Sequence, residues 1–278
     1  MKRFFVTVLS LALMSLPAFA ETNWGFRGSI GLEKKLAKGL DAELEAKYHQ
    51  TDNFSKTDRW SLGVSLSKRL YRNETKTFSL KAAVGYKFMN VYNGWSTKYK
   101  GDLTGIEDGM DPQYYIDNKY SFNYNNSYID SRHRATASVQ ASVEKGRFKI
   151  SLREMYQFTH TDSVEFTKDK YRYSAKNNAW KDPVSEPDGK PASNTQVLRS
   201  RISIDYNIPN WKYDPFISYE LYNGIDDGFK AQKSRFTAGI EFSFAKKHNF
   251  ELAYLWQNQH DNDEPAGSFI CLGYKFEF

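Results

Sequence analysis

The carboxyl-terminal stretch Ser268-Phe-Ile-Cys-Leu-Gly-Tyr-Lys-Phe-Glu-Phe278 alternates between two kinds of side chain. Successive side chains of a β-strand point to opposite faces. One face of this stretch therefore carries the apolar and aromatic residues Ile270, Leu272, Tyr274, Phe276 and Phe278, and the other carries small or charged residues. The pattern suits a strand with lipid on one side and a polar interior on the other, but the last strand of a soluble β-sandwich would look similar. The rest of the chain decides between the two.

A closing strand of this kind that ends on an aromatic residue resembles the signal by which the outer-membrane assembly machinery of Gram-negative bacteria recognises β-barrel proteins. The resemblance implies that the five apolar residues of the stretch, which end at Phe278, form an assembly signal. It also implies that the assembly machinery is a partner of the chain during biogenesis.

The amino terminus has the pattern of a cleaved signal peptide. Lys2 and Arg3 precede an apolar run from Phe4 to Leu16, and the segment closes on the small-x-small site that ends at Ala20. The run is too short to span a bilayer. The sequence therefore predicts export, with residues 1–20 removed and residues 21–278 forming a single domain.

The composition favours a barrel over a helical membrane protein. Beyond residue 20 no stretch approaches the roughly 20 apolar residues of a membrane helix, and the mean hydropathy is −0.69. Yet aromatic residues make up 16% of the chain. A barrel reconciles the two facts because only every second strand residue faces lipid. The single cysteine excludes an intramolecular disulfide, and the mild net charge of +6 is spread along the chain without a nucleic-acid-binding motif.

The same alternation recurs along the chain, for example in residues 24–33 and 78–89. Two long polar stretches, about 92–130 and 160–195, interrupt it and are predicted to be outer loops, because barrels carry long loops outside and short turns on the periplasmic side. Eleven strand segments are found, whereas bacterial single-chain barrels use even numbers. The sequence predicts an all-β fold, a transmembrane antiparallel up-and-down β-barrel of 10 to 12 strands, with 12 favoured.

Several of these segments resemble, in order, an exported bacterial family that is known only as a domain of unknown function, number 2490. The resemblance rests on generic strand motifs, among them Glu33-Lys34-Lys35-Leu36, Gly85-Tyr86-Lys87-Phe88 and Leu198-Arg199-Ser200-Arg201. Members of the family look like outer-membrane barrels, so the resemblance implies that fold and that location. It brings no catalytic residues.

Charged residues of both signs occupy the face predicted to line the lumen. In a narrow barrel the interior is nearly filled by side chains, so ion pairs across the lumen are expected. The same residues suit either a plugged structural barrel or a narrow pore that selects small solutes. The predicted lumen-lining residues are Arg27, Glu43, Glu45, Lys47, Arg59, Lys81, Lys87, Arg134, Arg153, Arg199, Arg201, Asp205, Glu220, Arg235, Glu241 and Glu251.

A lipid-modifying barrel enzyme would need a histidine with a nearby serine and an orienting partner at the lipid-facing rim. His160-Thr161-Asp162-Ser163 is the only local candidate, and it departs from the His-x-Ser spacing of outer-membrane phospholipases. The remaining histidines lack the paired spacing of a metal site. Acidic loop residues around Asp108 and Asp261 are predicted to be solvated rather than to hold calcium.

The sequence thus predicts an outer-membrane protein of a Gram-negative bacterium, in contact with lipid, without enzymatic activity, cofactor, metal or nucleic-acid partner. The favoured function is a structural protein or a narrow passive channel. A barrel enzyme acting on phospholipid or lipid A and a soluble periplasmic β-protein are the alternatives. The Tyr- and Asn-rich first loop suits either an adaptable binding surface or a cover over the mouth. The oligomeric state is not predicted.

Overall fold

The computed structural model describes residues 23–209, 211–245, 247–259 and 265–278. The signal peptide predicted at residues 1–20 lies outside these residues. The single helix of the described residues, α2 (Pro112–Asp117), has six residues, and no described helix is long and apolar enough to cross a membrane.

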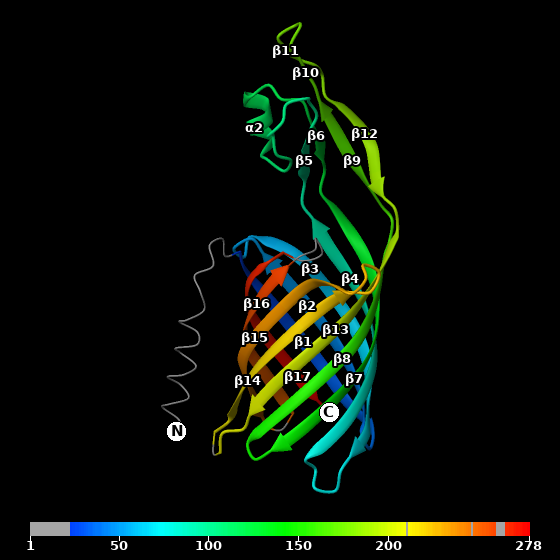
Figure 1. The fold of residues 1–278 in the computed structure, drawn as a ribbon, viewed down its shortest axis with the longest axis vertical. Helices are drawn as coiled ribbons and strands as arrows, with labels where there is room; N and C mark the ends of the chain where they lie inside the picture. The colour runs from blue at the N-terminus through cyan, green and yellow to red at the C-terminus, as the bar shows by residue number, and fades with distance from the viewer. Residues whose placement is uncertain (1–22, 210, 246, 260–264) are drawn as a thin grey trace.

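Within the described residues, eleven long strands close into one barrel (Figure 1). Each strand pairs in antiparallel fashion with its neighbours, except where the first strand meets the last. This confirms the all-β barrel and the range of 10 to 12 strands. The barrel strands are β1 (Trp24–Ala37), β2 (Leu40–Thr51), β3 (Lys56–Arg72), β4 (Phe78–Asn93), β7 (Tyr128–Lys145), β8 (Phe148–Thr161), β13 (Ser193–Tyr206), β14 (Tyr213–Gly224), β15 (Lys230–Phe244), β16 (His248–Gln259) and β17 (Gly267–Glu277).

The strand number differs from the favoured value of twelve. The eleven segments found in the sequence are the eleven barrel strands of the described residues, so no strand of that barrel was missed. The barrel closes with an odd number because β1 and β17 run parallel, with Phe26 opposite Ile270 and Leu32 opposite Phe276. Even strand numbers are needed only where the first and last strands pair in antiparallel fashion, and in this chain they pair in parallel.

The outer surface of the barrel is apolar and its interior is polar. Ile30 and Val64 are 61% and 52% exposed although both lie in the middle of long strands, whereas Arg59 is only 3% exposed. Side chains alternate across each strand, so the apolar set covers the outside and the polar set fills the lumen. A water-soluble fold has the reverse arrangement, and this one matches a barrel surrounded by lipid.

Aromatic side chains form belts around the barrel near the ends of its strands. At the end with short turns, ring contacts join neighbouring strands from Tyr213 to Phe242, from there to Phe250 and on to Tyr274. Near the other end Trp60 contacts Phe88. Tyrosine and tryptophan favour the boundary between lipid and water because their rings are amphipathic. The two belts mark the limits of an apolar band.

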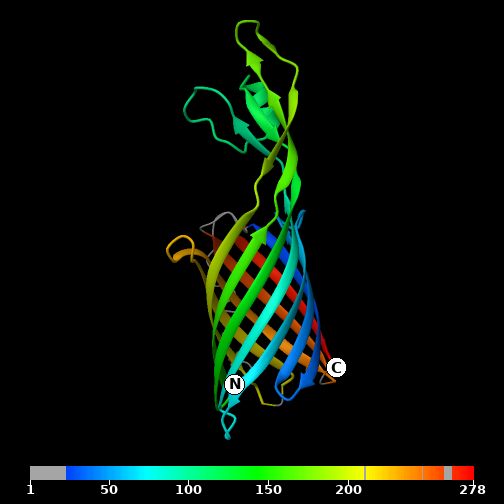
Figure 2. The ribbon, with the colours of Figure 1, turned by 90° about the vertical axis from the view of Figure 1, so that its right-hand side faces the viewer.

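The connections between strands differ greatly at the two ends of the barrel. At the end where the chain terminates they are short, and glycine supplies the left-handed conformation they need, as at Gly39 (φ 71°) and Gly146 (φ 64°). At the opposite end the connections from β4 to β7 and from β8 to β13 rise well beyond the barrel (Figures 1 and 2). We call these two connections, residues 94–127 and 162–192, the extension.

The extension is ordered into a second sheet, so the polar stretches at 92–130 and 160–195 are more than irregular loops. Its strand order is β12-β9-β6-β5, and a two-residue pair, β10 with β11, lies at its tip (Figure 1). Aromatic side chains supply its core: Tyr115 and Phe122 are fully buried, and the Phe122 ring stacks on Tyr171 with centroids 4.7 Å apart. The elements are β5 (Ser96–Tyr99), α2, β6 (Phe122–Asn125), β9 (Val164–Tyr171), β10 (Tyr173–Ser174), β11 (Ala179–Trp180) and β12 (Val184–Lys190).

Candidate functional site: the charged lumen

Two polar cavities lie inside the barrel. The first, about 390 Å³, is nearer the short turns and is lined by Glu33, Asp41, Glu43 and Lys81, among others. We call it the turn-side cavity. The second, about 340 Å³, reaches toward the extension and is lined by residues that include Arg27. We call it the central cavity.

The structure brings most of the predicted lumen residues together around these two cavities. Fourteen of the sixteen line one or both of them. Asp205 and Glu241, near the turn-side ends of β13 and β15, line neither cavity. Asp205 instead faces Lys149, with their charged atoms 3.5 Å apart.

Six charged residues line both cavities and therefore mark the place where the cavities meet. Five of them are cationic and one is a carboxylate, so this part of the lumen carries an excess of positive charge. They come from β2, β4, β7, β8 and β13, which together with β3 form one continuous half of the barrel wall. We call these residues the shared ring: Glu45, Lys47, Lys87, Arg134, Arg153 and Arg199.

Glu45 is the only carboxylate of the shared ring and is held between two ammonium groups. Its Oε1 lies 2.8 Å from Nζ of Lys47 and its Oε2 lies 3.6 Å from Nζ of Lys87. The three residues reach the same point because Glu45 and Lys87 both lie opposite Gly63 in the register of β2, β3 and β4. A glycine there leaves room for the two long side chains above it.

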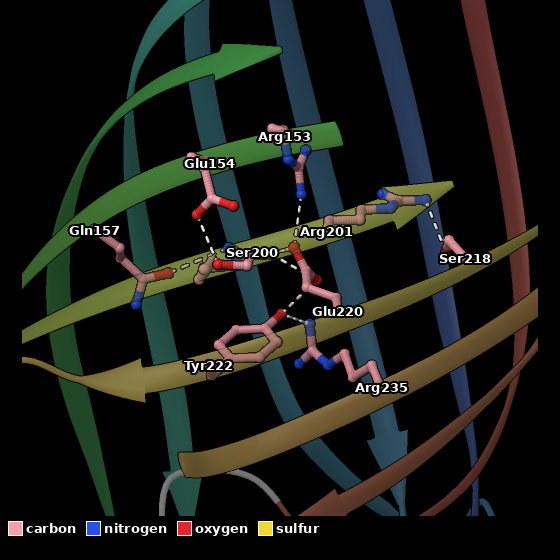
Figure 3. A network of polar contacts seen from close by, with 10 residues as sticks. Arg153, Glu154, Gln157, Ser200, Arg201, Ser218, Glu220, Tyr222 and Arg235 are labelled. Carbon is pink, nitrogen blue, oxygen red and sulfur yellow. Dashed lines mark hydrogen bonds and ion pairs between the residues drawn. The ribbon is translucent and has the colours of Figure 1, made fainter. Parts of the chain in front are cut away.

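Glu220 organises a second network across β8, β13 and β14 (Figure 3). Its Oε1 accepts hydrogen bonds from Arg153 (2.7 Å) and Arg199 (3.0 Å), and its Oε2 accepts one from Arg199 (3.1 Å). The Tyr222 hydroxyl donates to the same carboxylate at 2.9 Å and accepts from Arg235. Glu220 is only 6% exposed, so its charge depends on these donors for compensation.

Neutral side chains fill the lumen beyond the central cavity, toward the extension. Phe269 and Gln257 are each 1% exposed and lie one inward position closer to the extension than Cys271 and Leu255, which line the cavity. Arg27 joins the two, because its guanidinium stands 4.1 Å over the Phe269 ring and donates to Gln257 Oε1 at 3.0 Å. This layer narrows the lumen at that end.

Sequence reasoning missed the residues of this layer because it looked only for charge. One signal was present: Phe269 is an aromatic residue on the polar face of the closing strand, where its neighbours at 271 to 277 are small or charged. Four of the five residues of the predicted assembly signal lie on the opposite, outward face of β17, with Ile270 opposite Phe26 of β1 and Tyr254 of β16. The fifth, Phe278, directly follows the strand, and its ring lies 6.0 Å from that of Phe276.

His160 lies at the rim of the barrel, away from both cavities. Its Nδ1 is 2.8 Å from Asn194 Oδ1 and its Nε2 is 3.5 Å from Asp162 Oδ1. The other Asp162 oxygen lies 3.6 Å from Nε2 of His133. Both ring nitrogens of His160 thus face Asn194 and Asp162, whereas a nucleophilic serine would need one of them as its base.

The structure offers no metal centre in the part of the chain it describes, where no group of three or more His, Cys, Asp or Glu is placed to hold an ion. Asp108 and Asp111 have local roles in the extension. Asp108 accepts from the Tyr99 amide, and Asp111 caps α2 by accepting from the amide of Gln113, each at 2.8 Å. The other acidic group, around Asp261, lies outside the described residues.

Comparison with known proteins now gives the family. A family model described as "Protein of unknown function (DUF2490)" matches residues 24–266. The chain belongs to this family. This confirms the resemblance drawn from the strand motifs. No curated protein matches the chain in sequence.

Two solved outer-membrane proteins are among the structures similar to this member of the family. The translocator domain of autotransporter NalP from Neisseria meningitidis shares 10% identity at a TM-score of 0.41, covering 93% of this chain and 90% of that chain. OmpT (in-vitro folded), an outer membrane protein of Vibrio cholerae in trimer form, shares 9% identity at a TM-score of 0.21, covering 89% and 95%. At these scores neither structure bears on activity.

Proposed function

We propose that the mature chain is a barrel of the Gram-negative outer membrane that acts as a narrow passive channel for small solutes. The observation that carries the proposal is the pair of polar cavities inside the barrel, which meet at the shared ring. A structural barrel needs no internal space, whereas two adjoining cavities lined by charged groups form most of a path through the membrane.

Support for the membrane location comes from the outside of the barrel. The strands expose aliphatic residues at mid-length, and aromatic belts border this apolar band, which is the pattern of a transmembrane barrel. The signal peptide predicted at residues 1–20 fits export. We place the extension on the outer side because long connections lie there in barrels of this class.

A plugged structural barrel is the second candidate, and one observation favours it. The layer that contains Phe269 and Gln257 fills the lumen between the central cavity and the extension. If this layer does not move, solutes cannot pass, and the barrel serves to anchor the extension in the membrane and display it.

We propose that the chain is not an enzyme. The geometry of His160 supports this, because its ring nitrogens face Asn194 and Asp162 and leave neither for Ser163. The purified wild-type protein should hydrolyse phospholipid no faster than buffer alone does, and replacing Ser163 with alanine should leave that rate unchanged. A phospholipase activity that S163A removes would overturn this part of the proposal.

The channel is tested by the conductance of the refolded mature chain in a planar bilayer. We expect discrete steps whose ion selectivity shifts toward cations in the Lys87→Glu and Arg201→Glu variants, because both residues line the central cavity. Lys176→Glu, at the exposed tip of the extension, is the matched control and should leave selectivity unchanged. A folded, heat-modifiable barrel that gives no steps would refute the channel and favour the plugged barrel.

A further inference from the structure

The central cavity carries far more positive than negative charge. Among the described residues that line it, nine are lysine or arginine and only three are carboxylates: Glu45, Glu220 and Glu251. Asp58, just behind the lining, pairs with Arg59 at 2.7 Å, and counting it leaves an excess of five positive charges around a space of about 340 Å³. Charges enclosed by low-dielectric walls are screened less than surface charges, so such an excess raises the local concentration of anions. The cavity is therefore electrostatically suited to an anionic ligand.

The chemistry of the donors narrows the type of anion. Seven of the nine cations are arginines, whose planar guanidinium forks match the oxygen atoms of phosphate and carboxylate groups. Glu220 accepts from Nη2 of both Arg153 and Arg199, and Gln157 accepts from Nη1 of Arg199, but the Nε atom of each arginine is buried without a hydrogen-bond partner. These two buried donors, on the neighbouring strands β8 and β13, have no acceptor among the described residues, so both guanidinium groups keep unused donor capacity at the wall of the cavity.

We infer that the central cavity binds a small multivalent oxyanion of the phosphate class, either inorganic phosphate or a small phosphate monoester. The inference rests on the proposed channel and names its solute class. Lys87 and Arg201 border the space from β4 and β13, and the guanidinium side chains of Arg153 and Arg199 line it as well. A ligand cavity of about 340 Å³ is at the lower end of the usual range of 300–1,000 Å³, which suits small solutes and excludes oligosaccharides.

A solute site within a pore has a consequence for ion flow. Conduction requires binding that is strong enough to attract the solute and weak enough to release it. Phosphate occupying the central cavity would stand between the shared ring and the layer of Phe269, where chloride must also pass. We expect phosphate to reduce chloride current in a saturable manner.

The test uses isothermal titration of the detergent-folded mature chain with inorganic phosphate, and separately with glycerol 3-phosphate, at fixed salt. The variants are Lys87→Met and Arg201→Gln, with Lys176→Met as the matched control on the extension. Heat-modifiable gel mobility shows whether each variant is folded. Lys87→Met preserves the length of the side chain, and this keeps the test usable if the change at Arg201 prevents folding.

We expect saturable binding that weakens at least about tenfold in each lumen variant and is unchanged in the control. If inorganic phosphate binds more tightly than glycerol 3-phosphate, the ligand is free phosphate; if glycerol 3-phosphate binds more tightly, the ligand is a phosphate monoester. Failure of both ligands to bind the folded wild type, or binding that the lumen variants leave unchanged, would overturn the inference. Conductance separates the two proposals. Phosphate binding without current would refute the channel but not the phosphate site, and current without phosphate binding would refute the phosphate site but not the channel.

Discussion

Replacing Glu220 with glutamine removes one charge from the centre of the lumen and keeps the shape of the side chain. Its carboxylate accepts from Arg153 and Arg199 at 2.7 to 3.1 Å. Opposite charges about 4 Å apart interact by roughly 4 kcal/mol at an effective dielectric constant of about 20, and the change removes two such pairs while both guanidinium groups stay inside. Glutamine can still accept a hydrogen bond. Breaking a buried pair from one side costs about 3–5 kcal/mol, and we expect E220Q to lower the free energy of unfolding by that amount.

The assay is urea unfolding of the barrel in phospholipid vesicles, followed by tryptophan fluorescence and by gel mobility. Asp52→Asn is the matched control because Asp52 and Lys56 form a comparable ion pair, 2.7 Å long, that is 49% and 71% exposed. Exposed pairs contribute at most about 1 kcal/mol. If E220Q changes the free energy of unfolding no more than D52N does, the network of Figure 3 does not hold the barrel together.

Three further predictions concern the extension and the lipid-facing surface. Phe122→Ala removes a fully buried ring and should cost the extension about 3–5 kcal/mol, raising hydrogen exchange in residues 94–127 while the barrel strands stay protected. Hydrogen bonds from Lys170 and Lys168 lower the pKa of the Glu186 carboxyl, and a hydrogen bond from Lys168 lowers the pKa of the Asp188 carboxyl. These ion pairs stabilise the pairing of β9 with β12 at any pH above the ordinary carboxyl pKa, and the stabilisation is lost as the pH falls through the lowered pKa values. Intrinsic-rate-corrected exchange should therefore increase in β12 at acid pH, and a pH-independent profile, or one unchanged in E186Q, would contradict this. Glu154 lies at mid-length on the outer face of β8, where it accepts from Ser200 at 2.6 Å. Glu154→Leu should raise the free energy of unfolding in bilayers by about 1 kcal/mol because it removes a charge from the lipid-facing surface, and a lowered value would contradict the outward placement.

The strands could be predicted from the sequence because each carries its own signal. Apolar residues such as Ile30 and Val64 occur at every second position of their segments, and this period indicates a strand from local sequence alone. All eleven barrel strands were found for this reason. The closure was predicted less well, since the parallel pairing of β1 with β17 joins residues about 240 positions apart and leaves no local pattern.

The extension and the pairing inside the lumen could not be predicted for a related reason. β6 pairs with β9 across more than 40 residues, and the stacking of Phe122 on Tyr171 that holds the sheet together involves only a few aromatic residues in a polar background. The inward charges could be named from the alternation. Which of them meet, as Glu220 meets Arg153 from 67 positions away, depends on strand register, which turn geometry and packing determine and which the alternation alone does not reveal.

The most direct test of a water-accessible, positively charged lumen uses Cys271, the only cysteine of the chain, which lines the central cavity. The measurement is the rate at which the folded wild-type barrel in vesicles reacts with two small membrane-impermeant thiol reagents of similar size, one an anionic sulfonate and the other a cationic ammonium, with Cys271→Ser as the blank. We expect both reagents to modify Cys271 in the folded state and the anionic one to react faster. Modification only after unfolding, or faster reaction with the cationic reagent, would contradict it.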